Sequence, residues 1–512
     1  MYRRFLPAAL LLAPTLAHAE WHEASSKHFV VYADEDPGKL KAYTERLERF
    51  DLTLRFITGT PDKPLSPQLR VHVFFVENID AIHKLYGRSG VGGFYIPRSS
   101  GPVAFVPKNS GNGKLDGQTI LQHEYGHSFM YSTWPSAVFP KWFSEGFAEF
   151  VGSAFYRPNG ELIMGKAPDY RAYGLDRVGA MPAERLLSLT PKDEGLDSQT
   201  LYGRGFLLTH YSFLGGNTKP LVEYIGTLNA GKGIDEANKA WGNLATLDAK
   251  LNSYGKRPTL QTIAVTPDKV PVGEVKVRKL TPGEAATMKA RIYSTRGVDE
   301  KRAAEVVGWA RTTSAAYPND QGAQDELAEA EFDAKNYAAA EAAADRALAA
   351  DPSSIHALRY KGMAQMEIAQ AEKNKDPARW RTIRSWFIKA NKLDPNYPEP
   401  LILYYDSFEA AEQPATKAAQ DGLIGAYVLA PYDDGLRIKA GKVLLQQGNI
   451  KAARVAIEKI AYGPHSGKEN PALKVVQALD ASGPEAALKV IAEQEAEQKK
   501  KADEAKAKKK AA

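Results

Sequence analysis

The chain has 512 residues, of which 44% are hydrophobic and 25% charged, and this composition is typical of a globular protein of roughly two to four domains. Its 67 Lys and Arg residues against 61 Asp and Glu residues give a formal charge of only +6, which argues against a nucleic-acid-binding protein. Cysteine is absent, which excludes disulfides, thiol nucleophiles, iron–sulfur clusters and Cys-ligated zinc. Any metal site must therefore be built from His and carboxylate side chains.

The first 19 residues have the pattern of an export signal. Arg3 and Arg4 precede an apolar run over residues 5–16, and Ala17-His18-Ala19 follows as a small-x-small cleavage site. The apolar run is shorter than the roughly 20 residues that span a bilayer, and no later stretch is long enough. We expect residues 1–19 to be a signal peptide and the mature chain to be periplasmic or secreted in a bacterium, with no membrane span. The alternative is an uncleaved N-terminal anchor.

Between residues 20 and 256, strands come early and helices come late, which predicts an α+β domain. Apolar and alternating runs predict strands at 28–33, 69–76 and 103–106. Apolar residues at helical spacing predict helices at 39–58, 118–133, 142–155 and 197–214. The following segment, 257–297, contains the alternating runs VGEVKVRKL and ATMKARIYS, so we expect a short β-containing linker there.

Residues 298–467 are rich in Ala and are punctuated by proline at a nearly constant interval. The intervals are 34, 43, 36 and 33 residues between Pro318, Pro352, Pro395, Pro431 and Pro464. The tetratricopeptide repeat has a period of 34 residues. We predict a tetratricopeptide-like helical array whose concave surface binds a protein partner, the alternative being an ordinary Ala-rich bundle. The Lys/Glu/Ala-rich tail, 468–512, is expected to be helical or disordered.

The chemistry of the chain is concentrated in an H-E-x-x-H motif over residues 123–127. Positions i and i+4 share one face of a helix, so His123 and His127 can bind one ion, with Glu124 beside it. A third ligand is needed, and Glu145 on the next predicted helix can supply it. Two His and one Glu leave a coordination position open, as in catalytic zinc sites. We expect one Zn²⁺, with another divalent ion as the alternative.

Glu149 lies one helical turn beyond Glu145. Its carboxylate can accept a hydrogen bond from the second ring nitrogen of His123 and so fix the tautomer of that ligand. The alternative is a plain surface carboxylate.

The pentad and the run W-F-S-E-G-F-A resemble the two zinc motifs of the gluzincin metallopeptidases. The second motif is similar to W-L-N-E-G-F-A of aminopeptidase N-like enzymes, and the whole of residues 20–256 resembles the peptidase-MA-like domains of exported bacterial proteins. The resemblance implies a gluzincin fold, His123, His127 and Glu145 as zinc ligands, and Glu124 as the base that takes a proton from zinc-bound water.

Two further expectations follow from the resemblance. No G-x-M-E-N motif precedes the pentad, because residues 101–106 read GPVAFV, so an endopeptidase is expected rather than an aminopeptidase. The strand at 103–106 can still pair with an extended substrate. A donor to the oxyanion is also needed, for which Tyr202 is the first candidate and His210 the second. For each, the alternative is a packed helix residue.

Two functions fit this sequence. The first is an exported zinc metallopeptidase that acts on a peptide or protein substrate, with the repeat array for recognition. The second is a catalytically silent, peptidase-like scaffold whose repeats mediate protein–protein interaction. The presence of Glu124 favours the enzyme, because a structural role does not require a carboxylate at that position.

Overall fold

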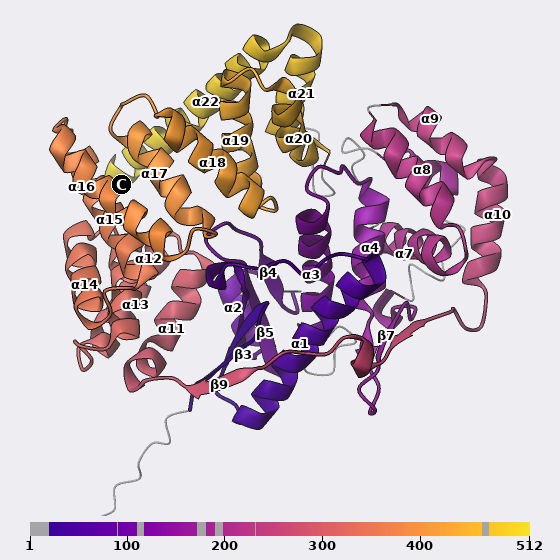
Figure 1. Cartoon of the computed structure of the whole chain (residues 1–512), viewed down its shortest axis with the longest axis horizontal. Coiled ribbons are helices and arrows are strands. Elements are labelled where there is room, and N and C mark those ends of the chain that lie inside the picture. The colour runs from indigo at the N-terminus through magenta and orange to yellow at the C-terminus, as the bar shows by residue number, and fades with distance from the viewer. Residues whose placement is uncertain are drawn as a thin grey trace, which may run out of the picture.

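The computed structural model of the chain describes residues 20–89, 91–109, 117–171, 181–189, 198–230, 232–462 and 470–511. The predicted signal peptide, 1–19, lies outside the described residues. The chain folds into a sheet domain with its own helices, followed by an array of helical hairpins that arches over one side of the sheet (Figure 1).

The main sheet has six strands in the order β4-β5-β3-β2-β1-β9. Their bounds are β1 (His22–Ser25), β2 (Phe29–Ala33), β3 (Val71–Asn78), β4 (Phe94–Ile96), β5 (Val103–Asn109) and β9 (Lys276–Lys279). The three strands β2, β3 and β5 run parallel, and the other three pair antiparallel. All five residues of β2 are buried, as expected for a parallel strand that is covered on both faces. The strands predicted at 28–33, 69–76 and 103–106 are confirmed.

Helices cover both faces of the sheet. On one face, α1 (Pro37–Thr58) and α3 (Gly117–Thr133) share a buried core with Val31 and Val73. On the other, α2 (Ile79–Tyr86) and α11 (Pro282–Arg296) pack on the alternate residues Val30 and Phe74. The strand predicted for the run ATMKARIYS is wrong, because these residues form part of the helix α11. A capping box between Thr281 and Glu284 starts this helix and outweighs the alternating pattern.

The rest of the sheet domain is mostly helical. It contains α4 (Lys141–Gly152), α6 (Ala183–Leu187), α7 (Ser198–Leu214), α8 (Thr218–Asn229), α9 (Ile234–Asn238), α10 (Leu244–Gly255) and a small sheet of β6 (Phe155–Tyr156), β7 (Leu162–Met164) and β8 (Ile263–Val265). The helix predicted over 142–155 ends at Gly152, because Phe155 and Tyr156 pair with β7 instead.

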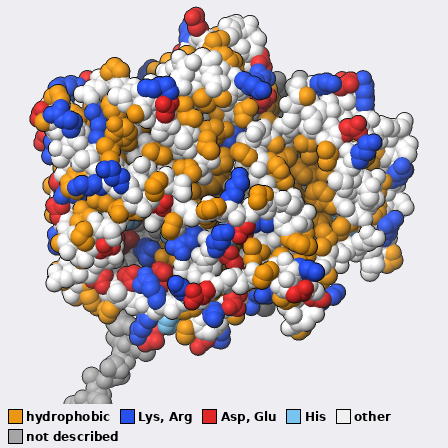
Figure 2. All heavy atoms as spheres, viewed as in Figure 1, with side chains coloured by type: hydrophobic (Ala, Val, Ile, Leu, Met, Phe, Trp, Pro, Cys, Tyr) orange, Lys and Arg blue, Asp and Glu red, His pale blue; other side chains and the backbone are white. Residues whose placement is uncertain are grey.

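An apolar hollow of about 950 Å³ opens between α4, α7 and α8. Figure 2 shows hydrophobic side chains gathered on this face of the molecule. Aromatic and aliphatic side chains line it, among them Phe139, Phe143, Phe147, Phe213, Leu221 and Ile225. Phe143 and Phe147 lie on the side of α4 opposite to Glu145, because each is two residues away on a helix of 3.6 residues per turn.

The array consists of consecutive helical hairpins. After α11 it continues through α12 (Glu300–Ser314), α13 (Gln321–Asp333), α14 (Tyr337–Ala350), α15 (Ile355–Ala371), α16 (Pro377–Leu393), α17 (Pro398–Ala410), α18 (Lys417–Leu429), α19 (Asp434–Gln446), α20 (Ile450–Ala461), α21 (Pro471–Ser482) and α22 (Pro484–Ala511). No helix among the described residues is both long and apolar enough to cross a membrane.

The helical repeat predicted from proline spacing is confirmed. Pro318, Pro352, Pro395 and Pro431 each lie between one hairpin and the next, whereas Pro464 is outside the described residues. The residue before a proline avoids the helical conformation, which ends the preceding helix. Alanines with no exposed surface lie where the helices pack together, including Ala328, Ala340, Ala344 and Ala347.

The packing of the array extends beyond its predicted end at 467. Val476 on α21 and Ala487 and Ile491 on α22 are buried in one cluster with Ile457 of α20. The segment predicted as a tail, 468–512, therefore begins as packed helices. Of the two states expected for it, helical and disordered, α22 is helical.

The inner side of the array contacts the chain's own sheet domain. Ser66 Oγ donates to Asp394 at 2.6 Å, and the Tyr397 hydroxyl donates to the carbonyl of Ser100 at 3.1 Å. The backbone N–H of Ser99 donates to Asp433 at 2.8 Å. The array thus holds the turn between β4 and β5.

Candidate metal centre

Close packing of α3 and α4 brings the two predicted motifs together. Gly126, inside the H-E-x-x-H motif, faces Val151 so closely that a Cβ there would lie 2.6 Å from the valine methyl group. Gly146 on α4 meets Gly205 on α7 in the same way, where any side chain would collide with backbone. The absence of side chains at these crossings places Glu145 beside the pentad.

The three predicted ligands converge. Nε2 of His123 and Nε2 of His127 each lie 3.6 Å from Oε2 of Glu145. One potential ligand atom of each residue lies within 4.8 Å of those of the other two. In the part of the chain that the structure describes, no other three His or carboxylate side chains converge in this way. Zinc bonds of about 2.0–2.1 Å place tetrahedral ligand atoms about 3.4 Å apart. The geometry and donor types therefore fit one zinc ion.

Each histidine keeps its second ring nitrogen for another partner. Nδ1 of His123 lies 3.4 Å from Oε1 of Glu149. Nδ1 of His127 lies 3.3 Å from Ser144 Oγ, which in turn lies 3.1 Å from the Tyr131 hydroxyl. These contacts leave Nε2 of both rings facing Glu145, which is the orientation that a bound metal requires. Sequence reasoning missed Ser144 and Tyr131.

Neighbouring side chains at the centre shift the pKa of His123 and of Glu145. Burial lowers the pKa of His123, but Glu145 and Glu149 raise it to about 10. Burial raises the pKa of Glu145, but His127 and His123 hold it well below its usual value. A divalent cation would replace the proton of His123, so metal binding is expected to release protons.

The first oxyanion candidate lies beside the centre, and the predicted base is adjacent to His123 in the sequence. The ring of Tyr202 lies edge-on to His123 with 6.3 Å between centroids, and Glu124 is partly exposed on α3. Tyr95 of β4 was missed by sequence reasoning. Its hydroxyl lies 2.8 Å from Ser128 Oγ, and both burial and the nearby Glu124 raise its pKa.

His210 is a packed residue, so the second oxyanion candidate is wrong. It has no exposed surface, and its Nε2–H is directed at the carbonyls of Gly165 and Gln261, both at 2.9 Å. Nδ1 accepts from the Tyr254 hydroxyl at 2.9 Å. Both ring nitrogens are thus used within the core.

The prediction that a substrate pairs with the strand at 103–106 is also wrong. That strand is β5, which lies between β3 and β4 and already pairs with both. Among the described strands, the edge strand beside the motif helix is β4, a part-buried strand of three residues that has no recognisable alternation in the sequence.

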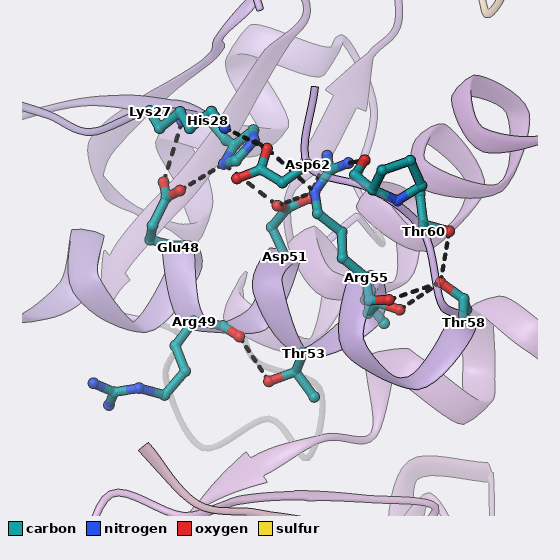
Figure 3. A network of polar contacts seen from close by, with 12 residues as sticks. Lys27, His28, Glu48, Arg49, Asp51, Thr53, Arg55, Thr58, Thr60 and Asp62 are labelled. Carbon is teal, nitrogen blue, oxygen red and sulfur yellow. Dashed lines mark hydrogen bonds and ion pairs between the residues drawn. The ribbon is translucent and has the colours of Figure 1, made fainter. Parts of the chain in front are cut away.

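A polar network joins α1 to the residues just before β2 (Figure 3), and Tyr125 connects the motif helix to it. Asp51 of α1 accepts hydrogen bonds from Arg55 Nε at 2.6 Å and from the hydroxyl of Tyr125, within the motif, at 2.5 Å. His28 donates from Nδ1 to Glu48 at 2.5 Å. Burial lowers the pKa of His28, but Glu48 and Asp51 raise it by more. The network ties α3 to α1 and β2.

Comparison with known proteins gives no family. No protein-family model and no curated protein matches the chain. Many solved structures are weakly similar to the chain, three of them as follows. PilF of Pseudomonas aeruginosa has a TM-score of 0.32 and 15% identity, covering 41% of this chain and 88% of its own. TTC0263, described as a thermophilic TPR protein of Thermus thermophilus, has a TM-score of 0.31 and 14% identity, covering 40% of this chain and 99% of its own. MamA of Desulfovibrio magneticus has a TM-score of 0.26 and 16% identity, covering 34% of this chain and 92% of its own. Similarities of this size assign no function.

Proposed function

We propose that the chain is a zinc-dependent metallopeptidase of the gluzincin type that hydrolyses internal peptide bonds. The observation that carries this proposal is the convergence of His123, His127 and Glu145 at the spacing of a tetrahedral site. Three protein ligands leave one position open, whereas a structural zinc site closes all four.

The roles of the side chains follow from their positions. His123, His127 and Glu145 would hold one Zn²⁺, which supplies a Lewis acid when bound. Glu124, next to His123, takes the proton of the attacking water and returns it to the leaving nitrogen. Tyr202 donates a hydrogen bond to the developing oxyanion.

The exposure of the ligands supports access from one side. The side chain of Glu145 is 1% exposed and that of His123 is 15% exposed. The centre is therefore closed on the side of α4 and reachable on the side of His123. An extended peptide that pairs with the outer edge of β4, which no described strand covers, would pass beside Tyr95 and the motif helix.

The second candidate function is an interaction protein in which the array binds a partner and the metal centre does not turn over substrate. The helical array supports this candidate, because stacked helical repeats commonly present protein-binding surfaces. In both proposals the protein is periplasmic or secreted in a bacterium, and this localisation depends on the predicted signal peptide.

Cleavage of a peptide library by the purified mature chain tests the proposal. We expect cleavage within peptides by wild type and none by Glu124→Gln, with zinc retained in both. Zinc without cleavage in wild type would favour the interaction protein. Cleavage that persists in Glu124→Gln would contradict the assigned base.

A further inference from the structure

A lysine of the repeat array reaches into the wall of the metal centre. Lys459 on α20 is 6% exposed, and its Nζ lies 3.7 Å from the centroid of the Tyr131 ring on α3. Among the residues that the structure describes, Nζ has no hydrogen-bond partner. In Figure 1, α20 lies directly above α3.

Packing alone does not account for a lysine at this position. Burying an amine without a hydrogen bond or a carboxylate is unfavourable, and an apolar side chain of similar size would fill the same space. Burial and the neighbouring Arg437 lower the pKa of Lys459 to about 6, although Asp434 opposes them. A residue that costs stability without a structural gain is expected at a functional site.

Tyr131 connects Lys459 to a metal ligand. Its ring is nearly parallel to that of His127, with 15° between the planes and 6.2 Å between the centroids. Its hydroxyl lies 3.1 Å from Ser144 Oγ, which lies 3.3 Å from Nδ1 of His127. Ser144 has no exposed surface and His127 is buried, so the contact between these two side chains is shielded from water.

The segment that carries Lys459 is firmly attached to the sheet domain. Arg437 on α19 has no exposed surface and donates to the carbonyls of Ala456 at 2.8 Å and Val455 at 2.8 Å, one turn before Lys459. The same guanidinium donates to the carbonyl of Pro135, just after α3, at 3.2 Å. Arg437 therefore joins the backbone just before Lys459 to the backbone just after α3, and this fixes the position of Lys459 over Tyr131.

We propose that the repeat array is a constituent of the metal centre and that Lys459 is a positioning residue for His127. Seated on one face of the Tyr131 ring, the amine keeps the side chain from swinging about its Cα–Cβ bond, and the hydroxyl stays at Ser144. Ser144 then accepts from Nδ1–H of His127, which leaves Nε2 directed at Glu145. The N–H groups of lysine face the ring in either protonation state. This inference rests on the proposed zinc site but not on turnover.

Zinc affinity of the full mature chain, measured by competition with a chelating dye, tests this role. We expect Lys459→Met to weaken zinc binding about 10-fold, within the range seen when a partner of a metal-bound histidine is removed. The visible spectrum of the Co²⁺-substituted protein should also change, because the geometry at His127 changes. Lys451→Met, an exposed lysine on the same helix, is the matched control and should leave both unchanged.

A double-mutant cycle separates positioning from a general packing effect. Tyr131→Phe keeps the ring beneath Lys459 but removes the link to Ser144, and it should weaken zinc binding as much as Lys459→Met does. The double variant should bind zinc about as weakly as either single variant, because both substitutions interrupt the same series of contacts. Lys459→Arg should retain most of the affinity, since a guanidinium also stacks on an aromatic ring.

The outcomes distinguish this inference from the proposed function. Wild-type zinc binding that Lys459→Met and Tyr131→Phe leave unaltered would overturn the role of Lys459 and leave the zinc site standing. Losses in the two variants that multiply in the double variant would also overturn it. A wild-type chain that binds no zinc would overturn both.

Discussion

The hydroxyl of Tyr125 donates a 2.5 Å hydrogen bond to Asp51, so the middle of the H-E-x-x-H motif is anchored to helix α1. Asp51 is fully buried and also binds Arg55. The motif helix is thus positioned by a residue that carries no metal chemistry itself.

Replacing Tyr125 by Phe should destabilise the fold. The change leaves the buried Asp51 with one donor fewer, and losing a hydrogen bond to a buried charged group costs about 1.5–3 kcal/mol. Urea unfolding followed by circular dichroism measures this loss. An unfolding midpoint equal to that of wild type would contradict the anchoring role.

The network around His28 should make stability depend on pH (Figure 3). Because the folded state raises the pKa of His28 above 6.5, its stabilisation is complete below pH 6.5 and is lost as the pH rises through the raised value. Glu48 has a pKa lowered from 4.5, so its contribution is present above pH 4.5 and is lost as the pH falls.

Thermal unfolding between pH 5 and 9 tests this prediction. The stability advantage of wild type over His28→Gln should be largest at pH 6 and should shrink as the pH rises above 6.5, because every other titrating group is common to both proteins. His83→Gln on α2, outside the network, is the control. A pH profile in His28→Gln that parallels wild type would refute the assignment.

Lys459→Met should stabilise the protein while it weakens zinc binding. The pKa of Lys459 falls from 10.5 to about 6 on folding, so at this group the folded state binds fewer protons between these values, and the destabilisation that Lys459 causes becomes smaller as the pH rises. Removing the buried amine removes this cost, by about 1–4 kcal/mol at pH 7. The gain should shrink as the pH approaches 10. A lower unfolding temperature in the variant at pH 7 would show that the lysine is stabilising.

Tyr202→Phe should slow cleavage without releasing zinc. If the Tyr202 hydroxyl stabilises the oxyanion, its loss should lower kcat about 10²–10³-fold and leave KM nearly unchanged. Single-peptide kinetics with metal content measured on the same sample decide this. Full activity in the variant would leave the oxyanion to be stabilised by another group.

The convergence of His123, His127 and Glu145 could be predicted from the sequence, because the four-residue spacing of the two histidines is read directly on one helix. Glu145 followed from its own motif on the next helix. Ser144 and Lys459 could not be found in the same way. Their contacts with α3 depend on how helices far apart in the chain pack, which no local pattern records.

The errors in the predicted fold have local causes. The strand β4 is three residues long, too short for alternation to be recognised. Residues 286–294 alternate like a strand, but the capping box at Thr281 starts a helix there. His210 follows the third ligand in the sequence, where the resemblance implies an oxyanion donor, but it is buried in the core instead.

The zinc content of the purified mature chain is the most direct test of the metal centre. We expect about one zinc per wild-type chain and a large loss in Glu145→Ala, with no loss in Glu161→Ala, which removes an exposed ion pair with Arg157. A wild-type chain without zinc, or a Glu145→Ala variant that keeps its full complement, would contradict the centre formed by His123, His127 and Glu145.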